Sequence, residues 1–233
     1  MNFSDKTVVV TGAAGSLGQA VAHAFAQQGA RLILIDLRAR NIPAAFRPGV
    51  ESLHANADLR NEAEVVCAVN KGFERFGRID VVCNLAGGFR MGEAVHETTR
   101  STYDFLFDLN IHTVINVARS VVPVMLKQGS GKIINVSAFA AQRGAALMGA
   151  YAAAKAAVAR LTEAMSAELR EHGINVNCVL PTILDTPENR KAMPLADPTK
   201  WVALDDLASA IVFLGSDGAK AIHGASLPVS GLS

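Results

Sequence analysis

Charge is scarce in this sequence and nearly balanced. Only 18% of the residues are charged, and the formal net charge is +1. So small an excess provides no broad basic surface for binding phosphate groups. We therefore expect neither a nucleic acid nor an anionic membrane as a partner.

Cysteine is equally scarce. Cys67, Cys83 and Cys178 are odd in number and lie within apolar runs. This is typical of small buried side chains in a reducing compartment rather than of a disulfide framework. The six histidines show no spacing typical of metal ligands. These scarcities favour a cytoplasmic protein without a bound metal.

Long apolar runs are also missing. No run approaches the roughly 20 residues that cross a bilayer. The first predicted strand, at 7–11, begins too early to leave room for a signal peptide. Half of the 233 residues are nevertheless hydrophobic, which is ample for a buried core. We expect a single domain that covers residues 1–233.

Short β-branched runs alternate with longer amphipathic ones. Strands are predicted at 7–11, 31–36, 50–56, 79–87, 132–137, 174–181 and 225–230, and helices at 16–28, 60–77, 102–128 and 151–172. Strands this apolar, separated by helices, predict a parallel sheet covered on both faces. The expected fold class is α/β, a single-domain doubly wound Rossmann fold with a seven-stranded parallel sheet between helices. Ligands of such sheets bind at the carboxyl ends of the strands.

Two segments lack regular periodicity. Segment 38–49 contains two prolines and is too short and broken for a good crossover helix. Segment 182–203 also contains prolines and shows little periodicity. Because a long irregular stretch in a compact domain is usually functional, we expect the second segment to form a lid-like loop.

Three glycines lie between the first strand and its helix. In TGAAGSLG, Gly12, Gly15 and Gly18 permit a tight turn and let backbone N–H groups reach a pyrophosphate at the positive helix end. The pattern is informative because it follows a strand, opens a helix and precedes a strand that ends in an acid. We predict a dinucleotide site that also includes Ser16 and Leu17.

The acid at the end of the second strand is Asp36. A carboxylate there can accept both ribose hydroxyls of an adenosine and would repel a 2′-phosphate, which favours NAD, preferably as NADH, over NADP. Arg38 and Arg40 follow closely and could receive that phosphate, so NADP stays open. After the third strand, Asp58 and Leu59 are expected to flank the adenine.

Tyr151 and Lys155 lie four residues apart in a predicted helix and therefore share one of its faces. A free tyrosine has a pKa near 10, and lowering it to about 7 requires roughly 4 kcal/mol of preferential stabilisation of the phenolate. One cation at about 4 Å supplies about that much at an effective dielectric constant near 20. The pair indicates a proton donor, Tyr151, whose pKa is lowered by Lys155.

The sequence resembles the short-chain dehydrogenase/reductase family over nearly its whole length. The resemblance is carried by the glycine loop, Asp36, NLAG at 84–87, Asn110, the Tyr151/Lys155 pair and Pro181. It implies an NAD(P)-dependent oxidoreductase that transfers hydride to a small-molecule substrate, with Tyr151 as acid. It further implies a homodimer or homotetramer assembled through the helices at 102–128 and 151–172.

The same resemblance assigns further residues to the site. Asn110 becomes a third catalytic residue, which would hold Lys155 through a water. Four others are expected to bind the cofactor: Ala86, Gly87, Pro181 and Ile183.

Three positions depart from the family pattern. Ser16 stands where the family has its middle glycine, Leu85 where it has a second asparagine, and Ala138 where it has the catalytic serine. All three departures are similar to the quinonoid dihydropteridine reductase branch, whereas Asn110 fits the general family better. We expect a dihydropteridine-reductase-like member.

Ala138 leaves several interpretations open. In an ordinary ketone or 3-oxoacyl reductase, a hydroxyl here would stabilise the developing alkoxide, and losing such a donor typically costs about 2.7–4 kcal/mol. Ser137 could replace it, although neighbouring strand residues point to opposite faces. A planar quinonoid substrate would spread the incoming charge and need no such donor. A catalytically silent NAD-binding sensor would also tolerate the alanine.

The fourth strand is followed directly by Phe89, Arg90 and Met91. These side chains could line a substrate pocket. They could equally form an ordinary surface loop, and both interpretations stay open at this point.

Overall fold

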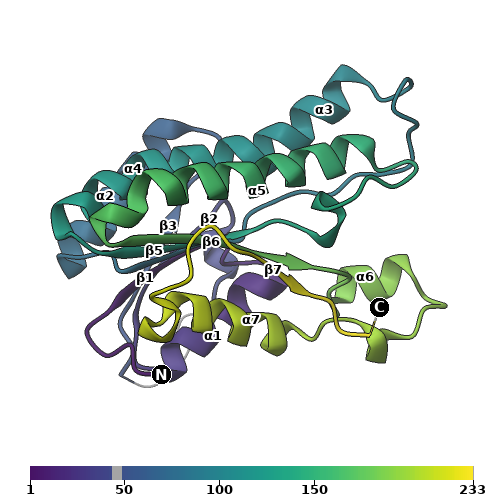
Figure 1. Cartoon of the computed structure of the whole chain (residues 1–233). Helices are drawn as coiled ribbons and strands as arrows, with labels where there is room; N and C mark the ends of the chain where they lie inside the picture. The colour runs from purple at the N-terminus through teal and green to yellow at the C-terminus, as the bar shows by residue number, and fades with distance from the viewer. Residues whose placement is uncertain (44–48, 233) are drawn as a thin grey trace.

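The computed structural model describes residues 1–43 and 49–232. Seven parallel strands form one sheet in the order β3-β2-β1-β4-β5-β6-β7 (Figure 1). Their bounds are β1 Thr7–Thr11, β2 Arg31–Asp36, β3 Ser52–Asn56, β4 Val81–Asn84, β5 Gly131–Val136, β6 Ile174–Pro181 and β7 Ser226–Val229. The predicted doubly wound fold is confirmed. The strand order reverses between β1 and β4, where ligands of such sheets bind.

Helices cover both faces of the sheet. On one face, α1 (Ser16–Gln27) and α7 (Leu204–Gly215) pack on alternate residues of β1 and β2. On the other face lie α2 (Glu62–Phe76), α4 (Thr113–Gln128) and α5 (Gly149–Leu169). Figure 1 shows these two helical layers above and below the strands. Burial on both faces explains why the central strands are apolar throughout.

The predicted helix at 102–128 is one continuous helical stretch with a change of geometry inside it. It begins as α3 (Arg100–Phe107), passes through a π-helical turn at Asp108–His112 and continues as α4. By length and composition alone, Arg100–Gln128 is apolar enough to cross a membrane, contrary to our expectation. Its buried residues pack against α2 and the sheet. That packing accounts for an apolar helix without any membrane.

Several boundaries and elements differ from the predictions. β4 ends at Asn84 rather than at 87, because the N–H groups of Leu85 and Ala86 turn to the Thr11 hydroxyl, at 3.1 and 3.4 Å. Helix α7 was not predicted at all. Within the expected lid, Pro187–Ala192 forms the short helix α6.

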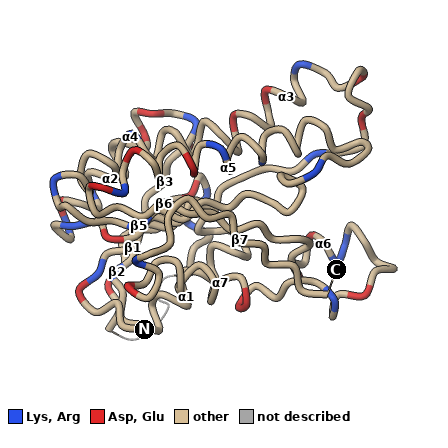
Figure 2. The backbone as a smooth tube through the Cα atoms, viewed as in Figure 1, with Lys and Arg blue, Asp and Glu red and all other residues tan. Residues whose placement is uncertain are grey.

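The lid returns to the body of the protein at its far end. Leu184 forms an isolated parallel bridge with Val202, and α6 lies in the chain between these two residues. Segment 38–49 is only partly described: Ala39–Asn41 form a 3₁₀ turn, and 44–48 lie outside the described residues. Lysine, arginine and acidic residues are dispersed along the described chain (Figure 2).

Candidate active site

The glycine loop is shaped by two contacts that exclude side chains. Gly12 has φ +66°, and a Cβ atom added to it would lie 3.0 Å from the backbone nitrogen of Ala86. A Cβ on Gly18 would overlap the carbonyl oxygen of Gly12. The turn and the first turn of α1 therefore fit together only with glycine at both positions.

The beginning of α1 presents free backbone donors. Gly15 precedes the helix and offers no side-chain cap. No hydrogen bond among the described residues uses the N–H groups of Ser16 and Leu17. Unpaired N–H groups at a helix N-terminus attract an anion such as a phosphate. The structure thus brings the predicted loop residues together in a form that can hold one.

Asp36 lies beside this loop, at the end of β2. Its Oδ2 accepts the N–H of Ala14 at 3.0 Å, and its Oδ1 accepts the N–H of Arg38 at 2.7 Å. Each carboxylate oxygen keeps a second lone pair that can accept a hydroxyl donor. Arg38 and Arg40 both lie exposed nearby in the chain.

Asp58 and Leu59 follow β3 as predicted, but they present different groups. The Asp58 carboxylate is paired with Arg60, at 2.6 Å, and the hydrogen bonds from Arg60 lower the pKa of Asp58. The Leu59 side chain is buried, and its carbonyl accepts the side-chain amide of Asn116 at 2.9 Å. Asn116 was not among the predicted residues, because its role depends on α4 lying against the loop that follows β3.

Gly87, Asn110 and Lys155 converge at the end of β4. A Cβ on Gly87 would lie 2.8 Å from Asn110 Oδ1 and 3.3 Å from Lys155 Nζ. Gly87 therefore leaves the space into which both polar groups point. The loop after β4 supplies Gly87, the π turn supplies Asn110, and α5 supplies Lys155. These three elements are distant in sequence.

Asn110 is fixed by the π-helical turn that contains it. Its Nδ2 donates to the carbonyls of Leu106 and Gly88, at 2.8 and 3.0 Å, and its Oδ1 accepts the Gly88 N–H at 3.2 Å. Single π turns inside α-helices frequently occur at functional sites. The turn here directs Asn110 towards the β4 loop, which locks that loop in place.

Lys155 is a buried cation. Its side chain is only 6% exposed, and its Nζ donates to the carbonyl of Val136 at 3.0 Å. Burial lowers the pKa of Lys155 from 10.5 to about 8. The ammonium group therefore carries its charge at neutral pH but titrates close to it.

Tyr151 lies one turn before Lys155 and is covered by Phe89. The two ring centroids are 4.8 Å apart and the rings are nearly perpendicular, at 86°. Burial raises the pKa of Tyr151 to about 12. This direction is opposite to the one we expected from Lys155. The reason is that burial removes the phenol from water and so disfavours the charged phenolate.

Ala138 follows β5 in extended conformation, with φ −156° and ψ 157°. Its neighbour Ser137 is 1% exposed and donates its hydroxyl to the Lys155 carbonyl at 2.6 Å. The interpretation in which Ser137 replaces the missing hydroxyl is therefore wrong for this structure. The alternation of strand side chains explains why Ser137 faces α5 instead.

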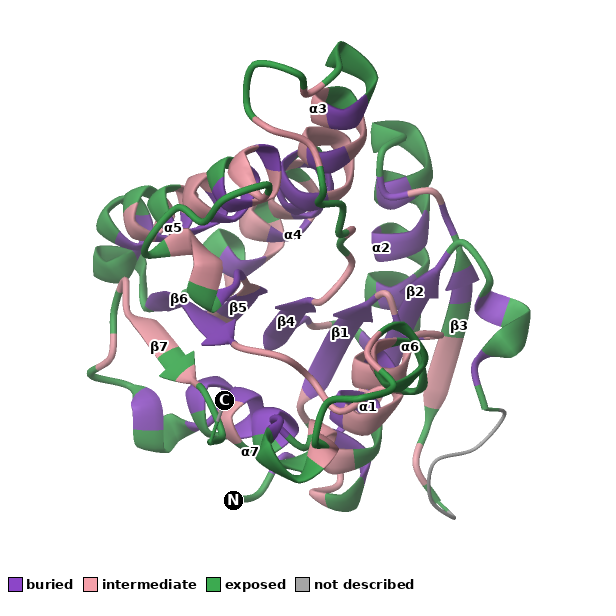
Figure 3. Cartoon of the chain, turned by 90° about the vertical axis from the view of Figure 1, so that its right-hand side faces the viewer, coloured by how far each residue is buried: buried purple, intermediate pink, exposed green. Residues whose placement is uncertain are grey.

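Pro181 and Ile183 mark the passage from β6 into the lid. Pro181 is the last residue of β6, and the Ile183 carbonyl accepts the Val202 N–H at 2.9 Å. Asp185 and Arg190 form a bidentate ion pair that spans the beginning of α6. Figure 3 looks towards the carboxyl ends of the strands, where α6 lies in front of the sheet.

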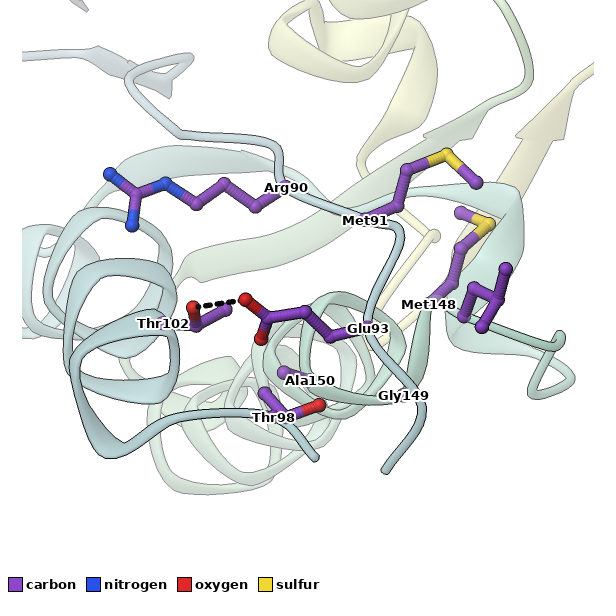
Figure 4. Close-up of a pocket in the computed structure, with 9 residues that line it drawn as sticks. Arg90, Met91, Glu93, Thr98, Thr102, Met148, Gly149 and Ala150 are labelled. Atoms are coloured by element: carbon purple, nitrogen blue, oxygen red, sulfur yellow. Dashed lines mark hydrogen bonds between the residues drawn. The ribbon is translucent and has the colours of Figure 1, made fainter. Parts of the chain in front are cut away.

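A small pocket lies beside the N-terminus of α5. Its volume is about 130 Å³, and it is lined by Arg90, Met91, Glu93, Thr98, Thr102, Leu147, Met148, Gly149 and Ala150. Within it, the Thr102 hydroxyl donates to the Glu93 carboxylate at 3.3 Å (Figure 4). Arg90 and Met91, which follow the fourth strand, thus line a pocket. Phe89, just before them, covers Tyr151 instead.

Comparison with known proteins places this arrangement among related enzymes. Residues 6–195 match the family described as short chain dehydrogenase. The sorbitol dehydrogenase of Cereibacter sphaeroides is 36% identical over 189 residues, covering 79% of this chain and 73% of that protein. The levodione reductase of Leifsonia aquatica is 30% identical over 251 residues, covering 98% and 94%. The crystal structure of an NAD⁺-bound xylitol dehydrogenase has a TM-score of 0.92 at 25% identity, covering 99% and 100%.

Proposed function

The chain belongs to the short-chain dehydrogenase/reductase family, and from this we propose that it is an NAD(H)-dependent oxidoreductase acting on the carbonyl group of a small molecule. The observation that carries the proposal is the convergence of Lys155, Asn110 and Gly87 one helical turn from Tyr151. A proton donor, a cation and a space for a cofactor ring are needed together for this chemistry.

The residues present fit a dinucleotide. Gly12 and Gly18 permit the tight turn that opens α1, because a Cβ atom at either position would meet the backbone of Ala86 or of Gly12 itself. The N–H groups of Ser16 and Leu17 would hold the pyrophosphate, and the two Asp36 oxygens would accept the ribose hydroxyls. NAD is preferred because Asp36 repels a 2′-phosphate, while Arg38 and Arg40 leave NADP possible. When bound, the reduced nicotinamide supplies the hydride.

Tyr151 completes the reduction by giving its phenolic proton to the carbonyl oxygen as hydride adds to the carbonyl carbon. The carbonyl becomes an alcohol, and the phenolate regains a proton from water. Moving the Tyr151 pKa from about 12 to near neutrality requires roughly 7 kcal/mol. Lys155 and the positive charge of the oxidised cofactor would share this stabilisation. Lys155 would also bind the cofactor ribose and help to position the cofactor.

A second candidate, reduction of a quinonoid ring in the manner of dihydropteridine reductase, is favoured by Ala138. A methyl group stands where an alkoxide would require a hydroxyl donor, and Ser137 is committed to Lys155. Incoming electrons that spread over a conjugated ring need no such donor. The relatives named above, a sorbitol dehydrogenase and a levodione reductase, instead favour an ordinary alcohol or ketone.

The deciding experiment measures NADH oxidation by the wild type beside Tyr151→Phe. Substrates are a quinonoid dihydropterin, a cyclic diketone and a 3-oxoacyl thioester. We expect turnover of at least one, with a loss of at least a hundredfold in the variant and an unchanged dissociation constant for NADH. NADH binding without any turnover would instead support the silent sensor.

We further propose that the protein is a homodimer or homotetramer assembled through α4 and α5. A largely apolar groove runs between these helices, lined by Val114, Ile115, Ala118, Arg119, Val122, Pro123, Leu161, Met165, Glu168 and Leu169. A second copy would bury it. Light scattering should give the molar mass of a dimer or tetramer for the wild type. The control Val66→Glu, which changes an exposed residue of α2 outside the groove, should give the same mass. Leu161→Glu should give a monomer, and a monomeric wild type would refute the proposal.

Two remaining expectations form part of the same proposal. We propose that residues 1–233 act as one domain, and that the protein works in the cytoplasm. Its three cysteines are free thiols, two of them buried, which suits a reducing compartment. The cytoplasmic location can be tested by fractionating cells of the native source. Detection of the protein outside the soluble fraction would contradict it.

A further inference from the structure

The ring of Phe89 is exposed although it contacts Tyr151. The residue is 55% exposed, yet one side of its ring packs on Tyr151. An aromatic pair of this geometry contributes only modestly to stability, so the remaining open surface of Phe89 is not explained by packing. It is available to a ligand that approaches the Tyr151 hydroxyl.

The backbone on both sides of Phe89 is anchored to the active site. Gly88 exchanges two hydrogen bonds with the Asn110 side chain, and the Gly92 N–H donates to the Leu147 carbonyl at 2.8 Å. Between them, the Arg90 guanidinium lies 3.7 Å from the centre of the Phe105 ring. Phe89 is therefore part of a fixed wall rather than of a loose surface loop.

Leu147, which accepts the hydrogen bond from Gly92, has a strained backbone. Leu147 has φ +61°, a conformation that residues other than glycine rarely adopt. Such strain persists where the surroundings enforce it, and it concentrates at binding sites. Here it turns the Leu147 carbonyl towards Gly92 and thereby joins the two loops that flank Tyr151.

Three apolar side chains near this contact are exposed. Met91 and Leu147 are both about half exposed, and Phe139 is exposed just after Ala138. Met91 and Leu147 line the same pocket beside the N-terminus of α5, the helix that carries Tyr151, and exposed apolar residues that gather in this way indicate a binding surface. A flexible polyol would leave its hydroxyl groups against these side chains without partners, whereas a flat ring would not.

We infer that Phe89 determines substrate specificity, by providing an aromatic wall on which a planar, conjugated cyclic ketone or quinone lies with one oxygen towards Tyr151. The inference rests on the proposed function, since it assigns the substrate class of that same site. A flat substrate covers the open part of the Phe89 ring, and its oxygen reaches the phenol beside it. The absent hydroxyl at Ala138 matters least for such a substrate.

The test compares a flat probe with a small flexible one. The probes are 9,10-phenanthrenequinone and dihydroxyacetone, each assayed with NADH. In Phe89→Ala we expect the KM for the quinone to rise about five- to tenfold. The ratio of kcat/KM for the quinone to that for dihydroxyacetone should fall by a similar factor, because uncovering Tyr151 affects both probes alike. Phe89→Trp should keep the low KM. Phe73→Ala, which removes an exposed phenylalanine from α2, is the matched control and should change neither value.

A second measurement separates this inference from the proposed function. The dissociation constant of the quinone is measured on the NAD⁺-loaded protein, which has no hydride to transfer. Weaker binding in Phe89→Ala supports the wall even where no reduction occurs, and absent reduction then counts against the proposed function alone. Reduction of the quinone with unchanged constants in Phe89→Ala overturns the wall alone. Equal losses for both probes, or a wild type that does not bind the quinone, would also overturn it.

Discussion

The Ser137 hydroxyl donates a hydrogen bond of 2.6 Å to the backbone carbonyl of Lys155, and both residues are buried. This bond fastens the chain just after β5 to α5 at Lys155, the cation that we propose to assist Tyr151. It also commits the only hydroxyl adjacent to Ala138 in the chain. The hydroxyl that an ordinary ketone reductase needs is therefore not recovered from the neighbouring position.

Restoring that hydroxyl should improve reduction of ordinary ketones. We expect Ala138→Ser to raise kcat/KM for an aliphatic ketone by about tenfold or more, because one donor to a developing oxyanion is typically worth about 10²–10³ in rate. The gain for a quinonoid ring should be at most about twofold. Steady-state assays with both substrates check this, with Ala140→Ser as control. An equal gain for both substrates would contradict the assignment.

The close fit of the glycine loop makes a second prediction. A methyl group on Gly18 overlaps the Gly12 carbonyl oxygen, so the turn must open. We expect Gly18→Ala to raise the dissociation constant for NADH more than tenfold and to lower the free energy of unfolding by about 1–3 kcal/mol. Fluorescence titration and urea unfolding measure the two effects.

Gly144→Ala is the matched control for this change. No atom lies within 4 Å of a Cβ added at Gly144, and its φ is not in the left-handed region. Both measured quantities should stay at their wild-type values in this variant. Unaltered NADH binding in Gly18→Ala would show that the loop does not hold the dinucleotide.

Asp36 should set the preference between the two cofactors. In Asp36→Asn the charge that repels a 2′-phosphate is removed, so the ratio of kcat/KM for NADPH to that for NADH should rise at least tenfold. Part of the change should come from weaker NADH use, since an amide cannot accept both the Ala14 and Arg38 N–H groups. Glu171→Gln removes an exposed acid and is the control. An unchanged ratio would exclude Asp36 from the ribose site.

Much of this site follows from sequence periodicity. The bounds of β1, β2 and β6 agree with the prediction to the residue. Parallel strands place their carboxyl ends at one edge, so the glycine loop, Asp36 and Gly87 could be expected together. Helix α7 was not predicted, although Leu207, Ala208, Ile211 and Val212 recur at helical spacing and are buried, so the sequence did carry a signal for it.

The electrostatics of the site could not be predicted in the same way. The Tyr151 pKa is raised because the phenol is buried, and one of its covering residues, Phe89, comes from a loop distant in sequence. The lowered Lys155 pKa likewise reflects complete burial. Spacing on one helix indicates which two groups are neighbours, but solvent exclusion depends on how segments distant in sequence pack over them.

The titration of Lys155 predicts the pH dependence of the reaction. Its pKa is lowered to about 8, so the ammonium charge is present below about pH 8 and is lost as the pH rises through that value. Tyr151 cannot produce this limb, because its pKa of about 12 keeps the phenol protonated throughout. Since kcat/KM reports the free enzyme, we expect it to fall up to tenfold per pH unit above about pH 8. In Lys155→Arg, which keeps its charge, the decline should be absent from pH 7 to 10, whatever activity remains. A wild-type profile that is flat to pH 10 would show that the Lys155 charge does not assist proton transfer.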